Sequence, residues 1–148
     1  MERDERVMER KMFETLSLET PERQALVLIT DEVRRVIHES GVAEGLCIVF
    51  CPHTTAGLTI NSALDPATAQ DLRHELDRLV PTRVDFIHTF DTPSDAAGHI
   101  KATLVGPQLT LIVHDGTLVL GSAQGVFLCE FDGPRRRQVH VKVVADSR

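Results

Sequence analysis

The segment that most constrains the fold is a pair of strand-like runs joined by a short polar turn. The first run, GLCIVFC, begins at Gly45, and the second, GLTIN, follows the turn. Proline cannot donate to a sheet ladder, so the first strand is expected to end at Pro52. The turn therefore carries His53, Thr54 and Thr55 at the end of an apolar scaffold. The alternative is a histidine that only hydrogen-bonds within its own tight turn.

Composition and charge argue against some classes of function. The chain has 148 residues, of which 42% are hydrophobic and 26% charged, as in ordinary globular proteins that bury one core. No apolar run could span a bilayer, and the charged N-terminus contains no signal region, so we expect a cytoplasmic protein without a membrane partner. The formal net charge of −6 argues against binding nucleic acid along its phosphate backbone.

Local patterns predict a flexible charged leader at residues 1–10 and a single domain at residues 11–148. Thr30 and Asp65-Pro66 are expected to start helices, and Gly41 to end the first one. The segment from Thr82 to Gly98 shows no regular pattern and is expected to be a long loop. Strands are expected at residues 11–18, 45–51, 57–61, 109–113, 117–120, 126–131 and 138–144, and helices at 30–40, 66–80 and 96–105, while residues 21–29 fit either a strand or a helix start.

The three cysteines are expected to be reduced core residues. An odd number of cysteines without a signal peptide argues against a disulfide framework. Cys47, Cys51 and Cys129 each lie in an apolar run.

Several polar residues could converge on one site. His53 follows the first strand, His88 lies in the long loop, and Asp95 precedes His99 by one helical turn. Three imidazoles and a carboxylate match the ligands of zinc or another divalent metal. Their order does not match HExxH or a cysteine-based zinc signature, so the ligand types alone do not identify a metal site. Asp95 fits three roles equally well: orienting His99, holding a metal, or capping a helix.

These residues belong to a longer series of motifs that resembles the YjbQ-like family. The resemblance extends from about Phe13 to Val144 and implies a compact α+β domain with a β-sandwich core and two main helices, assembled as a homotrimer with the polar cluster near subunit boundaries. Ala123 departs from the family pattern, which has Trp there, and so does Ser62 after Asn61. The motifs are PHTTAGLTIN, Asp65-Pro66 with Asp71, His88, Asp95, His99-Ile-Lys-Ala, Gly106, Gly116-x-Leu118, Leu120-Gly121, Gln124, Glu130 and Asp132-Gly-Pro-Arg135.

The resemblance implies a thiamine-phosphate synthase-like transferase. The reaction joins an aminopyrimidinylmethyl diphosphate to a thiazole phosphate and releases pyrophosphate. Its barrier lies in separating the diphosphate from a carbocation-like carbon, so catalysis needs fixed donors or a divalent cation beside the developing charge. The implied catalytic residues are His53, His88, Asp95 and His99; the implied phosphate-binding residues are Thr54, Thr55, Lys101, Gln124 and Arg135; and a divalent metal, zinc or magnesium, is expected on His53, His88 and His99.

Other classes stay open on the sequence. The same residues fit a metal-dependent hydrolase that activates water, or a non-catalytic trimeric protein that binds a metal or a phosphate ligand. Arg135 and Arg137 could bind phosphate bidentately, although a run of three arginines also fits a solvated turn. In every case the expected partner is a small phosphorylated molecule.

Overall fold

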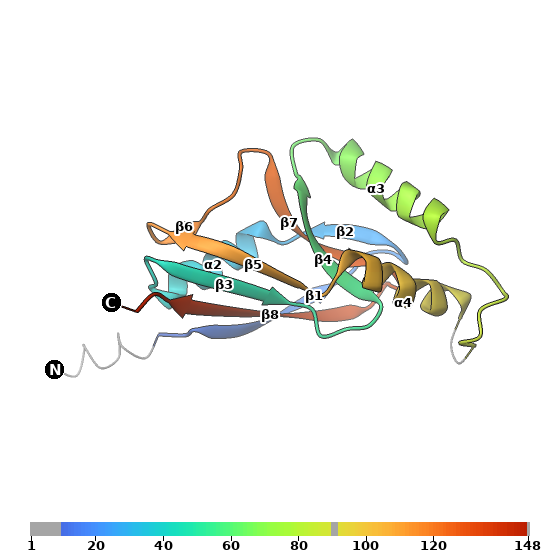
Figure 1. Ribbon diagram of the computed structural model, residues 1–148, viewed down its shortest axis with the longest axis horizontal. Coiled ribbons are helices and arrows are strands. Elements are labelled where there is room, and N and C mark those ends of the chain that lie inside the picture. Colours follow the sequence, from blue (N-terminus) through green and yellow to red (C-terminus); the bar gives the residue numbers. More distant parts are fainter. Residues whose placement is uncertain (1–9, 90–91, 148) are drawn as a thin grey trace.

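The computed structural model describes residues 10–89 and 92–147, which form eight strands and three helices (Figure 1). The strands make two antiparallel sheets, with the orders β1-β8-β3-β5-β6 and β2-β7-β4. This confirms the expected α+β fold; residues 1–9 of the expected leader lie outside the described residues. The strands are β1 (Phe13–Glu19), β2 (Ala25–Leu28), β3 (Gly45–Phe50), β4 (Ala56–Ser62), β5 (Gln108–His114), β6 (Thr117–Leu118), β7 (Gln124–Glu130) and β8 (Arg136–Ala145), and the helices are α2 (Thr30–Ser40), α3 (Pro66–Leu79) and α4 (Pro93–Val105).

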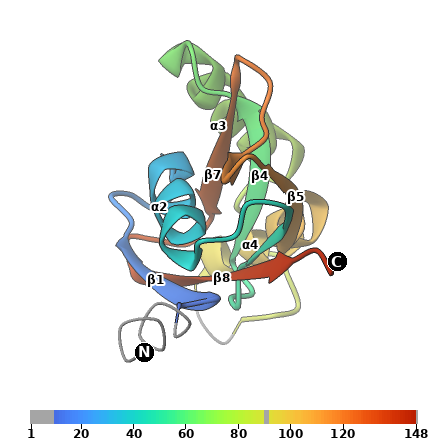
Figure 2. The same cartoon turned by 90° about the vertical axis from the view of Figure 1, so that its left-hand side faces the viewer.

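The core lies between the two sheets and the inner face of α2. In β8 every second residue is buried, including Val139, Val141 and Val143, because side chains alternate along a strand. In β7 nearly every residue is buried, since this strand lies at the centre of its sheet. Figure 2 shows α2 between β1 and β7, where Val33 and Ile37 join the same apolar cluster.

The first helix has the predicted bounds, but its start is not capped as predicted. Gly41 follows α2 in the left-handed conformation (φ 74°), which favours glycine. Thr30 was expected to be the N-cap, and this prediction is wrong. Its hydroxyl accepts a hydrogen bond from the backbone N–H of Val126 at 2.9 Å and so ties the helix to β7 instead.

The second helix follows its start signal but buries none of its residues fully. The Asp65 carboxylate accepts a hydrogen bond from the Ala67 N–H at 3.0 Å, and Pro66 is the first helical residue, as expected. None of the residues of α3 is buried, and Leu79 is 61% exposed. The helix lies at the outside of the molecule, beyond the end of β4 (Figure 1).

The third helix starts three residues before its predicted position. Pro93 is its first residue, and the Thr92 hydroxyl accepts a hydrogen bond from the Asp95 N–H at 3.3 Å. Thr92 is therefore the N-cap, and Asp95 lies within the first turn with its side chain free for another role. Along residues 10–89 and 92–147, none of the helices is both long and apolar enough to cross a membrane.

The remaining segments have the predicted type of structure, but some of the strands differ from the prediction in length. Residues 21–29, which fitted two structures, contain strand β2. The predicted turn at Asp115 and Gly116 joins β5 to β6, and both residues have positive φ angles, 52° and 77°, as a tight hairpin requires. Strand β7 starts at Gln124, two residues before the predicted start at residue 126.

The cysteines are buried and unpaired with one another, as predicted. Cys47, Cys51 and Cys129 are at most 1% exposed. Burial raises the pKa of Cys47 and of Cys129 to about 12, so neither forms a thiolate near neutral pH.

Candidate functional site

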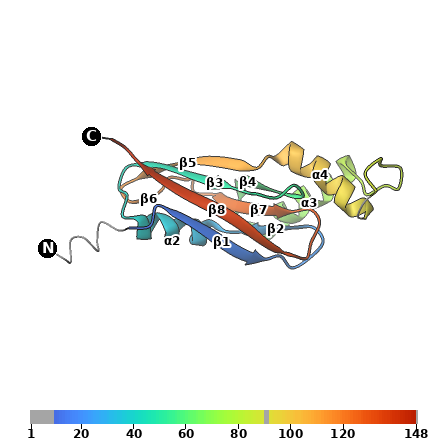
Figure 3. The ribbon, with the colours of Figure 1, turned by 90° about the horizontal axis from the view of Figure 1, so that it is seen from below.

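The polar turn after β3 borders a cleft of about 410 Å³, here called the histidine cleft. Its other walls come from the loop before α4, the first turns of α4 and the segment around the start of β8. Figure 3 shows α4 at the end of the molecule opposite both termini. The three predicted histidines all reach this cleft within a single chain. The lining residues are Pro52, His53, Thr54, Thr55, His88, Asp95, His99, Arg135 and Arg137.

Two of the histidines meet at one carboxylate oxygen. The Nε2 atom of His88 lies 2.7 Å from Oδ2 of Asp95, and Nε2 of His99 lies 3.2 Å from the same oxygen. The two imidazole rings stand edge to face with centroids 5.0 Å apart. Asp95 is buried, whereas His88 and His99 remain 46% and 39% exposed. The carboxylate is thus the fixed member, and the imidazoles face the open cleft.

The position of α4 explains this geometry. Asp95 and His99 are one turn apart and share a face of the helix. Gly98, between them, lets α4 approach the turn after β3, because a Cβ at Gly98 would lie 3.2 Å from the side chain of Thr55. The helix therefore holds the carboxylate and the second imidazole directly beside the Thr54-Thr55 turn.

Asp95 is ionised in this setting. Burial favours the neutral acid, but the hydrogen bond from His88 and the charge of His99 outweigh it, so the pKa of Asp95 lies below its usual range. A buried carboxylate that stays charged and faces two imidazoles is a good ligand for a cation.

The donor set fits a divalent metal, though not the set predicted from the sequence. The ligand atoms of His88, Asp95 and His99 all lie within 4.8 Å of one another. Two imidazole nitrogens and one carboxylate oxygen are the protein ligands of many catalytic zinc sites, which keep a further position open. Magnesium prefers oxygen ligands, so the geometry favours zinc over magnesium. His53 is not part of this group, and Asp95 takes the third place that was predicted for it.

His53 is engaged elsewhere through its ring. Its Nε2 accepts a hydrogen bond from the backbone N–H of Gln138 at 2.8 Å, so in the neutral ring the proton resides on Nδ1. Burial and the charge of Arg137 lower the pKa of His53. The ring is therefore a neutral hydrogen-bond donor at neutral pH, unsuited to bind a metal through Nε2.

A buried ion pair supports the floor of the cleft. Arg137 donates to Glu130 through Nε at 2.8 Å, and its Nη2 donates to the hydroxyl of Thr55 at 2.8 Å. Thr20 donates to the same carboxylate at 2.7 Å. Burial raises the pKa of Glu130, but the hydrogen bonds from Arg137, the Asp132 N–H and Thr20 and the charge of Arg137 together outweigh it, and the net shift is downward. Arg137 is only 3% exposed, so it holds the threonine turn in place and does not form a solvated turn.

This framework was not predicted from the sequence, although the sequence contains a signal for it. Arg137 lies two residues before Val139 and shares its inward-facing side of β8. An arginine in phase with a buried strand face needs a buried acid as partner. Glu130 at the end of β7 is that acid.

Arg135 and Thr54 are the side chains best placed to bind an anion in the cleft. Arg135 is 48% exposed and lines the cleft, while its Nη2 donates to the carboxylate of Asp132 at 2.7 Å. This ion pair fixes the guanidinium and leaves part of its surface open to solvent. Thr54 lines the same space, whereas the hydroxyl of Thr55 accepts from Arg137. The predicted phosphate-binding role stays a prediction for Thr54, Thr55 and Arg135.

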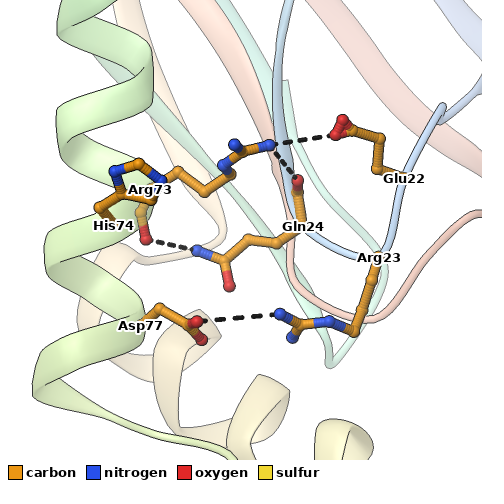
Figure 4. A pocket seen from close by; sticks show the side chains of 6 residues that line it. All are labelled: Glu22, Arg23, Gln24, Arg73, His74 and Asp77. Carbon is orange, nitrogen blue, oxygen red and sulfur yellow. Dashed lines mark hydrogen bonds and ion pairs between the residues drawn. The ribbon is translucent and has the colours of Figure 1, made fainter.

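Lys101 was expected to bind phosphate beside the histidines, but its side chain does not line this cleft. The side chain is 1% exposed, and its Nζ donates to Gln24 and to Asp77, each at 2.8 Å. Gln24 and Asp77 belong to a separate pocket of about 340 Å³ between α3 and the segment before β2 (Figure 4). Arg73 in that pocket is itself bonded to Glu22. Lys101 therefore joins α4 to α3 and does not face the histidines.

Gln124 also lies away from the cleft of its own chain. It is the first residue of β7, and its side chain accepts a hydrogen bond from the Gly121 N–H at 2.8 Å. Glu130, at the cleft end of the same strand, is six residues further on, which corresponds to about 20 Å. Within one chain Gln124 is out of reach of the histidines.

A second group of possible metal ligands carries less weight. Glu44, His114 and Asp115 also bring ligand atoms within 4.8 Å of one another, but all three side chains are exposed. The carboxylate of Glu44 contacts the ring of His114 and accepts a hydrogen bond from the Asp115 N–H in the hairpin. These two contacts account for the proximity of the three side chains.

Comparison with known proteins identifies relatives over nearly the whole chain. The family described as UPF0047 protein YjbQ-like matches residues 14–146. The UPF0047 protein MJ1081 of Methanocaldococcus jannaschii is 43% identical over 137 residues, which cover 93% of this chain and 97% of that protein. The UPF0047 protein YugU of Bacillus subtilis is 37% identical and covers 90% and 99%.

Solved structures show the same fold. A conserved YjbQ/UPF0047 protein from Clostridium acetobutylicum superposes with a TM-score of 0.84 at 41% identity, covering 88% of this chain and 99% of that one. A protein from Aeropyrum pernix superposes with a TM-score of 0.86 at 27% identity, covering 92% and 100%.

Proposed function

The chain belongs to the UPF0047 YjbQ-like family, and we propose that it is a metal-dependent transferase of the thiamine-phosphate synthase type. The observation that carries the proposal is the pair of imidazoles on one buried carboxylate, His88 and His99 on Asp95, in a cleft that Arg135 also lines. Such a site combines ligands for a divalent cation with a donor for phosphate oxygens.

The proposed reaction places each group in a definite role. The bond between the methylene carbon of an aminopyrimidinylmethyl diphosphate and its diphosphate oxygen breaks, and the electron pair leaves with pyrophosphate. The thiazole nitrogen then forms the new C–N bond to that carbon. Arg135 and the hydroxyl of Thr54 bind the phosphate oxygens. His53 donates a hydrogen bond to the substrate through its Nδ1–H and keeps the proton. A divalent cation held by His88, Asp95 and His99 would supply further charge stabilisation for the leaving diphosphate.

The proposed setting is the cytoplasm, with a small phosphorylated substrate as partner. Multiply charged phosphates do not partition into a bilayer core, so enzymes that consume them work where they are made. The proposed assembly is a homotrimer, for which the apolar surface of α3 and of the segments on either side of it provides contact area. Leu64, Leu79 and Val84 are 73%, 61% and 91% exposed there.

The direct test is incubation of the purified protein with both precursors and assay of thiamine phosphate and pyrophosphate. We expect both products in equal amounts with zinc or another divalent cation, and loss of both after chelation. Absence of thiamine phosphate with every cation tried would refute the synthase assignment.

A hydrolase is the second candidate, because His88 and His99 are open to water. It predicts phosphate release from the diphosphate substrate when the thiazole phosphate is left out. A protein that binds zinc and phosphate but yields neither product would instead be the non-catalytic ligand-binding trimer.

A further inference from the structure

A second cleft adjoins the histidine cleft and has no role in the proposed chemistry so far. It measures about 430 Å³ and shares three wall residues, His53, Thr54 and His99, with the first. The shared residues form the boundary between the two spaces. The walls that belong to the second cleft alone, here called the apolar lobe, are Ala56, Ala102, Thr103 and Pro107.

The two spaces differ in chemistry. The histidine cleft contains Asp95, Arg135 and Arg137, whereas the walls that are particular to the apolar lobe carry no charge. Two of those walls are alanines, Ala56 and Ala102, so the space exists because short side chains leave it open. Uncharged pockets of a few hundred Å³ are where proteins bind the carbon-rich part of a ligand.

His53 supplies one directional group at the boundary. Its Nε2 is fixed by the N–H of Gln138, so its Nδ1–H is the donor left for a ligand. Among the described residues Nδ1 has no hydrogen-bond partner, and the ring lines both spaces. A ligand that passes the boundary therefore meets a fixed neutral donor.

We propose that the apolar lobe binds the uncharged ring of a substrate whose phosphate lies in the histidine cleft, with His53 donating to an acceptor atom on that ring. The ligand class is a phosphorylated heterocycle. Ala102 determines specificity, because it sets the depth of the lobe. This inference rests on the proposed function of the histidine cleft and extends it to the organic half of the substrate.

The test compares two probes by isothermal titration of the full chain: inorganic phosphate and phenyl phosphate. We expect phenyl phosphate to bind the native protein about tenfold more tightly than phosphate, since its ring is buried in the lobe. Ala102→Leu fills the lobe and is expected to weaken phenyl phosphate by about tenfold while phosphate stays within about twofold. The matched control is Ala67→Leu, which adds the same atoms on an exposed turn of α3 and is expected to change neither affinity.

Three outcomes would overturn the inference: equal binding of the two probes by the native protein, equal weakening of both by Ala102→Leu, or no binding of either. The thiamine phosphate assay separates this failure from failure of the proposed function. If product forms while the lobe shows no preference for the ring, only the lobe is excluded. If the ring preference stands while no thiamine phosphate forms, the synthase assignment is excluded and the lobe is retained.

Discussion

At the scale of single residues, His99 is the ligand whose removal tests the proposed metal site most directly. Its Nε2 faces Asp95, and its ring is half-exposed, so it contributes little to the core. We expect His99→Ala to reduce zinc affinity by at least roughly 100-fold, because even outer partners of metal ligands are worth 10–100-fold. The free energy of unfolding should stay within about 0.5 kcal/mol of the native value. Zinc titration and urea unfolding measure the two quantities.

The matched control for this variant is His74→Ala. His74 is exposed on α3 and lines the separate pocket of Figure 4. We expect its removal to leave zinc affinity unchanged. Equal losses in the two variants, or native zinc affinity in His99→Ala, would contradict the assignment of the site.

His53 should behave differently from the metal ligands in its response to pH. Burial and the charge of Arg137 lower its pKa in the folded state, so the unfolded chain binds more protons at mildly acidic pH. Its contribution to stability is therefore complete above the unfolded pKa and is lost as pH falls through the lower folded pKa. Nitrogen-detected NMR should show a neutral ring protonated on Nδ1 at pH 7, with a lower pKa than in the urea-unfolded chain. A proton on Nε2 would contradict the hydrogen bond from Gln138, and a raised pKa would contradict the burial of the ring beside Arg137.

The residues of the site could be predicted better than their contacts. His53, His88, Asp95 and His99 were expected together from motif resemblance and helical spacing, and all four line one cleft. Which of them share a carboxylate depends on the angle between α4 and the preceding loop, which no local pattern encodes. Lys101 shows this limit most clearly. It lies two residues after His99, so its side chain points to the other side of the helix.

At the scale of whole elements, α3 is held by polar contacts more than by its apolar stripe. Lys101 of α4 donates to Asp77 of α3 and to Gln24, and Gln24 donates to the Arg73 carbonyl at 2.8 Å. The hydrogen bond from Lys101 lowers the pKa of Asp77. This set of contacts connects three parts of the chain that are distant in sequence.

Asp77→Asn should therefore loosen α3. It leaves the ammonium of Lys101 buried without a charged partner, a change that costs 3–5 kcal/mol in a fully buried pair. Because Asp77 is 42% exposed, water replaces part of the interaction, and we expect a loss of about 2 kcal/mol. Urea unfolding measures it. Asp71→Asn, the same change at an exposed position of α3, is the control; equal stability of the two variants would exclude the anchoring role.

Sequence signals for a helix start agree with the structure where no tertiary contact engages the side chain of the capping residue. Asp65 caps α3 as its sequence predicts. The pair Thr92-Pro93 carries the same type of signal for α4, and the expected start at Ala96 overlooked it. Thr30 shows the opposite case, since tertiary contact with β7 uses the hydroxyl that the local pattern assigned to a cap.

At the scale of the whole molecule, we expect a homotrimer. Leu64, Leu79 and Val84 lie before, at the end of and after α3, and a single chain leaves all three apolar side chains exposed. Sedimentation equilibrium at micromolar concentration should give three times the mass of one 16.4 kDa chain. A monomer at that concentration would exclude the assembly.

The expected trimer also assigns Gln124 a testable role. If this residue binds the substrate phosphate, as the family resemblance implies, it must come from a neighbouring copy, since it is about 20 Å from the cleft end of its own strand. Mixed trimers of Gln124→Ala and His99→Ala chains should then recover thiamine phosphate synthesis that each variant lacks alone. Failure of the mixture to recover activity, with mixed trimers verified by mass, would restrict the site to one chain.

Helix α4 contributes side chains both to the histidine cleft and to the contact with α3, and this restricts which length changes the chain can tolerate. Asp95 and His99 face the histidine cleft, whereas Lys101 faces α3. One residue inserted or deleted between them would rotate the following part of the helix by about 100°, so chemistry and anchoring would be lost together. Variation in length among functional descendants of this chain should therefore be absent from residues 95–101.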